Sequence, residues 1–158
     1  MKILVMVNIT KLQNSYLRIK DYINKTPILI SEKLNQDFNA SFYLKNEVEQ
    51  VTGSFKIRGA LSALSKLKEI NINGVVAYSS GNHAQGVSKA AQIFDMHAII
   101  VMPEDAPQNK IDKTLANGAE VVLYKRHIES REEIALKIAD EKQYPLVKPF
   151  DNEDIIAG

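Results

Sequence analysis

From Val75 onward, short apolar runs alternate with stretches of helical periodicity, and no other feature of the sequence constrains the fold as strongly. The runs Val75–Tyr78, His97–Met102 and Ala119–Tyr124 are apolar and rich in β-branched residues, as in strands that are buried on both faces. Strands that alternate with helices form a parallel sheet with right-handed crossovers and helices on both faces. The sequence therefore predicts an open parallel α/β sheet, in which Leu146-Val147 is the candidate for a fourth strand.

Periodicity and capping residues place a helix after each of these runs. Ala84–Phe94 follows the first run, and Ile111 and Leu115 mark the inner face of the second helix. Ser130, with a glutamate three residues later, is the capping box that opens the third helix. Gly86 lies inside the first helix, where glycine destabilises by roughly 1 kcal/mol relative to alanine. We therefore expect another backbone to approach Gly86 closely.

The region before Val75 follows a different pattern. Ser15–Asn24 has the spacing of a short amphipathic helix, and Pro27–Ser31 and Ala40–Lys45 are strand candidates. A Thr-Gly-Ser turn then leads into a further helix, with Ser54 as its expected cap. The apolar residues on one face of that helix are Ile57, Leu61, Leu64 and Leu67. We interpret this region as part of a second unit, which these residues do not complete.

Composition excludes several classes of function. With 158 residues, 45% of them hydrophobic and 25% charged, the chain is long enough for one globular domain and part of another. A net charge of +1 implies neither a nucleic-acid partner nor an acidic membrane surface, and the apolar run Ile3–Val7 is too short to span a membrane. The absence of cysteine excludes disulfides and thiolate metal sites, and it fits a reducing cytoplasm. His97 and His127 have no partner at metal-binding spacing, so we expect no metal site.

Lys56 is the first candidate for chemistry. A lysine is ordinarily a solvated charge, and composition alone favours that interpretation. Three features of its position favour a chemical role: Lys56 follows a Gly-Ser turn, it stands near a helix start, and Phe55 and Ile57 flank it. The positive end of a helix and apolar neighbours both disfavour an ammonium group. They favour the neutral amine, which is the form that a Schiff base requires.

The loop Ser79-Ser80-Gly81-Asn82-His83 is the second candidate. It follows a buried parallel strand and precedes a helix, which is where ligands bind in open α/β sheets. Free N–H groups at a helix start bind carboxylates or phosphates, and Gly81 allows the backbone to approach a ligand. The alternative is that Ser79 or Ser80 only caps the helix, and that His83 is structural. The glycines have neither dinucleotide-binding nor P-loop spacing, which argues against nucleotides.

Together these motifs resemble a known family. The runs Leu44–Glu47 and Thr52–Ala60, with Gln50 between them, resemble the cofactor-lysine signature of threonine dehydratases and serine racemases. Ser79–Val87 resembles the substrate loop of these enzymes. Three shorter segments share the likeness: Val101–Pro103, Pro149–Asp151 and Ile155–Gly158. The family consists of pyridoxal-phosphate enzymes with the tryptophan-synthase-β-like fold, so the resemblance implies that fold and that cofactor.

The resemblance also implies roles for the motif residues. Lys56 would bind pyridoxal 5′-phosphate as an internal aldimine and then act as the base at Cα, with Phe55 beside the cofactor and Asn82 bonded to its ring hydroxyl. The substrate carboxylate would lie against Ser79, Ser80, Gly81, Asn82 and His83. The implied reaction converts a β-hydroxy amino acid, L-threonine or L-serine, into a 2-keto acid and ammonia. Amino-acid metabolism such as isoleucine biosynthesis, a cytoplasmic location and a homo-oligomer are further expectations.

Ser80 leaves a second activity open. In racemases of the family, the matching serine is the acid and base on the opposite face of the cofactor. Many dehydratases have alanine at this position, and some have serine. A serine-racemase-type reaction is therefore the alternative, with Ser80 as a catalytic residue beside Lys56.

The glycines indicate what these residues do not supply. The family's phosphate cradle is a later glycine-rich loop, whereas no two of the seven glycines here are adjacent. By resemblance, residues 1–68 form the incomplete N-terminal part of the large cofactor domain, and residues 69–158 form the small α/β domain. We therefore expect the N-terminal half of such an enzyme, inactive alone and with exposed apolar surface that favours self-association. The alternative is a non-catalytic α/β remnant or interaction module that acts through a partner.

Overall fold

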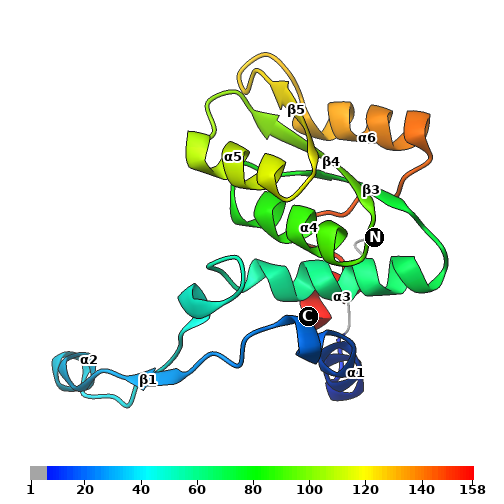
Figure 1. Ribbon diagram of the computed structural model, residues 1–158. Coiled ribbons are helices and arrows are strands. Elements are labelled where there is room, and N and C mark those ends of the chain that lie inside the picture. The colour runs from blue at the N-terminus through cyan, green and yellow to red at the C-terminus, as the bar shows by residue number, and fades with distance from the viewer. Residues whose placement is uncertain (1–6) are drawn as a thin grey trace, which may run out of the picture.

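A parallel sheet forms the centre of the molecule. The computed structural model describes residues 7–158, and its main sheet contains β3 (Gly74–Tyr78), β4 (His97–Pro103) and β5 (Glu120–Tyr124) in that spatial order (Figure 1). Both strand pairs are parallel, and every residue of β3 is buried. The predicted parallel α/β sheet is confirmed.

The candidate fourth strand is reduced to a single bridge. Leu146 pairs in parallel with Val76 at the free edge of β3, but no ladder extends from this pair. Pro145 and Pro149 flank the segment, and proline has no N–H group to donate to a ladder. The chain therefore touches the sheet at this edge and then leaves it toward the C-terminus.

Helices cover both faces of the sheet. Val75 and Ala77 of β3 point into the core that α4 (Asn82–Ile93) and α5 (Gln108–Ala116) share with the sheet. Val76 and Tyr78 point to the opposite face, where α6 (Arg131–Lys142) packs. This alternation follows from the two-residue period of a strand, and it confirms the expected helices on both faces.

The inner face of α5 differs from the prediction. Ile111 is buried as expected, but Leu115 is 50% exposed and Thr114 is completely buried in its place. The Thr114 hydroxyl donates to the Lys110 carbonyl at 2.8 Å, so burial leaves no unsatisfied polar group. The prediction failed because it followed apolar residues alone, whereas Thr114 can be buried with its hydroxyl satisfied within its own helix.

A second helical layer lies against α4. It consists of α3 (Lys56–Glu69), α1 (Ile9–Ile19) and the short C-terminal α7 (Glu153–Ala157) (Figure 1). One hydrophobic core joins α3 and α4, so the core is continuous across residues 68 and 69. The proposed division of the chain at that point stays a prediction.

Helix α1 begins and ends earlier than the predicted helix over Ser15–Asn24. The Asn8 side chain caps it by accepting a hydrogen bond from the Lys11 N–H at 2.9 Å, and a 3₁₀ turn over Lys20–Tyr22 follows it. Ser15 is buried on α3, where its hydroxyl donates to the Ser62 hydroxyl at 2.6 Å. The asparagine cap and this buried contact fix the helix one to two turns before the position that apolar spacing alone gave.

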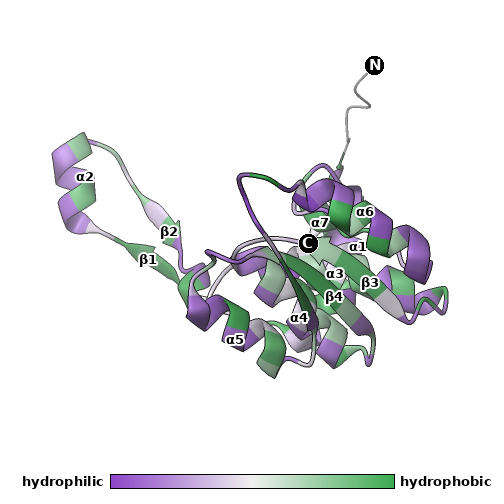
Figure 2. Cartoon of the chain, turned by 90° about the horizontal axis from the view of Figure 1, so that it is seen from above, coloured by the Kyte–Doolittle hydropathy of each residue, from purple (hydrophilic) through white to green (hydrophobic). Residues whose placement is uncertain are grey.

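An arm made of residues 27–46 extends from the body of the molecule (Figures 1 and 2). Its strands β1 (Ile28–Ile30) and β2 (Tyr43–Lys45) lie within the strand candidates Pro27–Ser31 and Ala40–Lys45, and they pair antiparallel. All six residues of these strands are exposed. A helix that the sequence reading missed, α2 (Glu32–Phe38), lies between them. Ser31 caps it, and Asn39 in the left-handed conformation ends it.

Candidate active site

Lys56 is the first residue of α3, as the sequence indicated, but Ser54 does not cap that helix. The N-cap residue is Phe55, which makes no side-chain capping bond. Ser54 is 7% exposed, and its hydroxyl has no hydrogen-bond partner among the described residues. The Lys56 amine donates to the Pro149 carbonyl at 2.9 Å and lies 5.2 Å from the centroid of the Phe55 ring.

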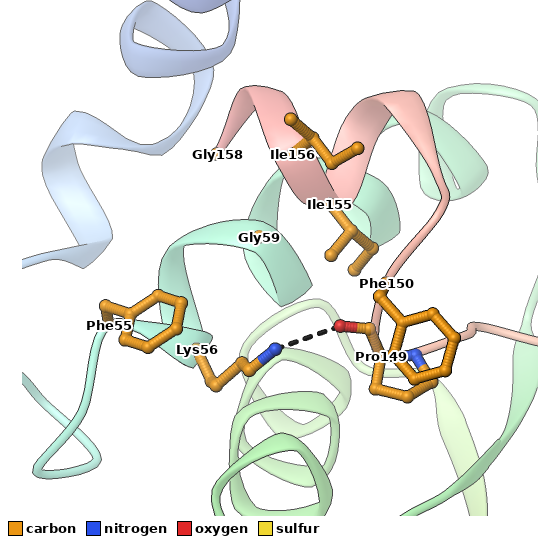
Figure 3. Close-up of a pocket in the computed structure, with 8 residues that line it drawn as sticks. All are labelled: Phe55, Lys56, Gly59, Pro149, Phe150, Ile155, Ile156 and Gly158. Carbon is orange, nitrogen blue, oxygen red and sulfur yellow. Dashed lines mark hydrogen bonds between the residues drawn. The ribbon is translucent and has the colours of Figure 1, made fainter. Parts of the chain in front are cut away.

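The amine of Lys56 opens into a cavity of about 260 Å³ between the start of α3 and the C-terminal segment. Figure 3 shows Phe55 and Phe150 on opposite sides of this amine. Among the described residues that line it, Lys56 is the one charged side chain, and the others are apolar or glycine. The other lining residues are Phe55, Gly59, Pro149, Phe150, Ile155, Ile156 and Gly158. The cavity therefore holds one amine donor inside an aromatic and aliphatic wall.

Gly59 allows α7 to close one side of this cavity. A Cβ atom at Gly59 would lie 2.5 Å from the carbonyl oxygen of Ile155, a distance that side chains do not tolerate against backbone. Only glycine at this position lets the two helices approach so closely. The motif glycine after Lys56 thus has a packing function, which the spacing of the motif did not reveal.

Polar residues of the first motif fix the loop that precedes Lys56. The Glu47 carboxylate accepts two hydrogen bonds from the Arg58 guanidinium, at 2.8 and 2.7 Å, and one from the Thr26 hydroxyl at 2.6 Å. These bonds lower the pKa of Glu47 from 4.5 to about 2, chiefly through Arg58. The Gln50 amide bonds Asn24 through both its oxygen and its nitrogen. These side chains therefore shape the approach to the lysine and lie outside its cavity.

The loop Ser79–His83 lies at the carboxyl end of β3, where the sequence placed it. The Ser79 N–H donates to the Val101 carbonyl at 3.0 Å, and the Ser79 hydroxyl accepts from the Gly81 N–H at 3.2 Å. Ser79 therefore shapes the loop, and Gly81 rather than either serine is the N-cap residue of α4. Ser80 is half-buried, and its hydroxyl has no partner within the described part of the chain.

Asn82 and His83 begin α4 but face different surroundings. Asn82 is exposed, and its side-chain oxygen accepts from the Lys110 amine at 2.8 Å. His83 is 3% exposed, with Nε2 lying 3.1 Å from the Val147 carbonyl. Burial lowers the pKa of His83 from 6.5 to about 4, and the nearby positive charge of Lys56 adds to this effect. The ring is therefore neutral at physiological pH, and its Nε2–H donates to Val147.

Helices α3 and α4 bring the two predicted motifs together. A Cβ atom at Gly86 would lie 3.1 Å from the backbone carbon and oxygen of Lys56. The expected close approach of a backbone to Gly86 is confirmed, and that backbone belongs to Lys56 itself. The lysine thus stands within about one helical turn of the N–H groups that begin α4.

The arrangement suits a planar aromatic aldehyde. An amine in an apolar cavity can form a covalent bond to an aldehyde carbon, and the two aromatic side chains can flank a flat ring. The N–H groups at the start of α4 suit a carboxylate. A phosphate group would find no second cation among the described residues that line the cavity. Residues 7–158 contain no cluster of three acidic or histidine side chains placed to bind a metal. None of the helices described in that range is long and apolar enough to cross a membrane.

Sequence reasoning missed two members of the site. The Pro149 carbonyl accepts a hydrogen bond from the amine of Lys56, and the Lys110 amine donates one to the side-chain oxygen of Asn82. The likeness over Pro149–Asp151 was the available signal for the first contact, but it gave no role to a backbone atom. Nothing in the spacing of Lys110 pointed to the second contact, because Lys110 belongs to a helix that follows the next strand.

Residues 19–158 match the family model described as "Pyridoxal-phosphate dependent enzyme". The L-threo-3-hydroxyaspartate ammonia-lyase of Saccharomyces cerevisiae is 47% identical over 142 residues, covering 89% of this chain and 44% of that protein. The L-threonine ammonia-lyase of Thermotoga maritima is 41% identical over 154 residues, covering 97% of this chain and 38% of that protein. The crystal structure of serine racemase from Dictyostelium discoideum superimposes with a TM-score of 0.88 at 38% identity, covering 96% of this chain and 50% of that one. The chain thus spans less than half the length of these two curated relatives.

Proposed function

The chain belongs to the family of pyridoxal-phosphate dependent enzymes, and on that premise we propose that it contributes the cofactor lysine and the substrate loop of an ammonia-lyase for β-hydroxy amino acids. L-Threonine and L-serine are the proposed substrates, and L-threo-3-hydroxyaspartate joins them by similarity to the yeast enzyme. The single observation that carries the proposal is the position of Lys56. Its amine lies in an aromatic-walled cavity, and its backbone packs against α4, the helix that begins at the loop Ser79–His83.

Lys56 has two proposed tasks. Its amine would hold the cofactor at the aldehyde carbon, and the free amine would accept the proton from the substrate Cα. When bound, pyridoxal phosphate supplies a conjugated ring that takes up the negative charge left at Cα. The apolar wall around Lys56 limits the access of water to the amine.

The start of α4 has the proposed task of orienting the substrate. Its unpaired N–H groups, together with the loop Ser79–Gly81, bind the substrate carboxylate. The Asn82 amide nitrogen donates to the cofactor's ring hydroxyl, while Lys110 holds the amide oxygen and so fixes the orientation of the group. Departure of the β-hydroxyl as water, followed by hydrolysis of the remaining enamine, releases a 2-keto acid and ammonia.

A racemase is the second candidate, and Ser80 is the observation that favours it. The Ser80 hydroxyl has no hydrogen-bond partner in the described chain, so it is available to donate a proton to Cα from the loop side. The similarity to the serine racemase of Dictyostelium discoideum supports this alternative. Appearance of D-serine from L-serine, abolished by Ser80→Ala, would select racemization over elimination.

The test begins with the purified 158-residue chain and pyridoxal phosphate. We expect the visible absorbance of an amine-bound cofactor in the native chain and its absence in Lys56→Ala; Lys137→Ala, which removes an exposed lysine of α6, is the matched control. Keto-acid release from L-threonine, L-serine and L-threo-3-hydroxyaspartate then identifies the substrate. Equal absorbance in the native chain and Lys56→Ala would refute the role of Lys56. Absorbance without turnover would mean that catalysis needs residues beyond these.

A further inference from the structure

Helix α4 contacts the backbone of Lys56 at Gly86, as described above. His83 lies three positions earlier on α4 and therefore on the same face of the helix. The amine at the far end of the Lys56 side chain lies in the cavity, where it donates to the Pro149 carbonyl.

Two hydrogen bonds and the backbone segment 147–149 between them connect His83 to the amine of Lys56. The His83 Nε2–H donates to the Val147 carbonyl at 3.1 Å, and the Val147 N–H donates to the Val76 carbonyl at 2.7 Å. These bonds fix Val147 against α4 on one side and β3 on the other. Two residues later, the Pro149 carbonyl accepts from the Lys56 amine at 2.9 Å. The position of that carbonyl therefore depends on where Val147 is held.

We propose that His83 is a positioning residue for Lys56, because its bond to Val147 holds the segment 147–149 where the Pro149 carbonyl can receive the lysine amine. The inference rests on the proposed function only in taking Lys56 as the cofactor lysine. By accepting its hydrogen bond, the carbonyl keeps the amine directed into the cavity. His83 itself contacts neither the cofactor nor the substrate in this role.

The unpaired ring nitrogen of His83 agrees with a positional role. Nδ1 is buried and has no hydrogen-bond partner among the described residues. An aliphatic side chain would fill the same space without leaving a polar atom unsatisfied. The histidine therefore serves through the bond that its Nε2–H makes, and glutamine is the substitution that can reproduce this donor without a titrating ring.

Lysine acetylation by a low dose of acetic anhydride, measured residue by residue by mass spectrometry, tests the proposal without any cofactor. An amine held by a hydrogen bond to a carbonyl must leave that bond before its nitrogen can attack the anhydride. His83→Leu removes the donor, so we expect Lys56 to be acetylated about tenfold faster, the factor expected for losing a charge-assisted hydrogen bond. His83→Gln should stay within about twofold of the native rate. Lys137, exposed on α6, is the internal control and should not change.

Three results would overturn the proposal: equal Lys56 acetylation in all variants, His83→Gln as fast as His83→Leu, or Lys137 accelerated in parallel with Lys56. Circular dichroism and melting curves establish that each variant is folded. If His83→Leu does not fold, His83→Asn takes its place, because its shorter amide stays polar but falls short of Val147. Native chain that fails to bind pyridoxal phosphate, yet shows this acetylation pattern, would refute the proposed function and leave the positioning role intact.

Discussion

Acidification below about pH 6.5 should destabilise the chain through His83. The pKa of His83 is about 4 in the folded chain, against 6.5 for an ordinary histidine, because the ring is buried. Between these values the unfolded chain binds a proton that the folded chain does not, so stability falls as the pH falls. The contribution of His83 is therefore complete above about pH 6.5 and is lost progressively as the pH approaches 4.

The pKa difference sets the size of the effect. Each pKa unit corresponds to about 1.4 kcal/mol, so His83 should account for roughly 2 kcal/mol of stability lost at about pH 5 and about 3 kcal/mol at about pH 4. A loss of that size is a substantial fraction of the total stability of an ordinary domain, which is about 5–15 kcal/mol. It should be visible as a lower midpoint in urea at unchanged slope.

Urea unfolding at a series of pH values, read by circular dichroism, measures the effect. The comparison is with His83→Gln, which retains the other two histidines, His97 and His127. The pH dependence of the native chain minus that of His83→Gln isolates His83. Parallel curves for the two proteins between about pH 7 and about pH 5 would refute the reasoning.

Three further predictions follow from the packing and charges. Gly59→Ala should lower stability by about 1–3 kcal/mol and weaken pyridoxal-phosphate binding, because the added methyl group forces α7 off the cavity; unchanged melting and binding would contradict this. Glu47→Gln should lower stability by roughly 2–3 kcal/mol above about pH 4.5 and less as the pH falls toward 2, because the pKa of Glu47 is depressed chiefly by Arg58; urea unfolding at about pH 7 and about pH 3 measures both. Ile30→Lys on the exposed arm should reduce aggregation measured by light scattering, whereas Ile128→Lys in the body should have less effect, although Ile128 is 76% exposed against 63% for Ile30.

The local patterns of the sequence were sufficient for the sheet and for the start of α3. Alternation of buried runs with helical periodicity predicted the parallel strands and the helices on both faces, because each period is a property of adjacent residues. The same reasoning missed α2, whose signals were a serine cap and an asparagine in the left-handed conformation. It also gave α1 the wrong bounds, because the cap at Asn8 lay outside the apolar spacing.

The candidate site divides in the same way. Sequence alone placed Lys56 at a helix start and the loop Ser79–His83 after a buried strand, and the structure has both there. It also indicated that a backbone meets Gly86. The identity of that backbone, the capping residue of α3 and the burial of His83 came only from the tertiary structure.

Sequence by itself determined where the candidate site residues stand, because residue type and local spacing place an amine at one helix start and N–H groups at another. Tertiary structure decided what the amine of Lys56 meets. Its partner, the Pro149 carbonyl, lies 93 residues away along the chain and is a backbone atom, which no side-chain pattern encodes. That contact exists because His83 and β3 hold the returning segment, so it depends on how distant parts of the chain pack together.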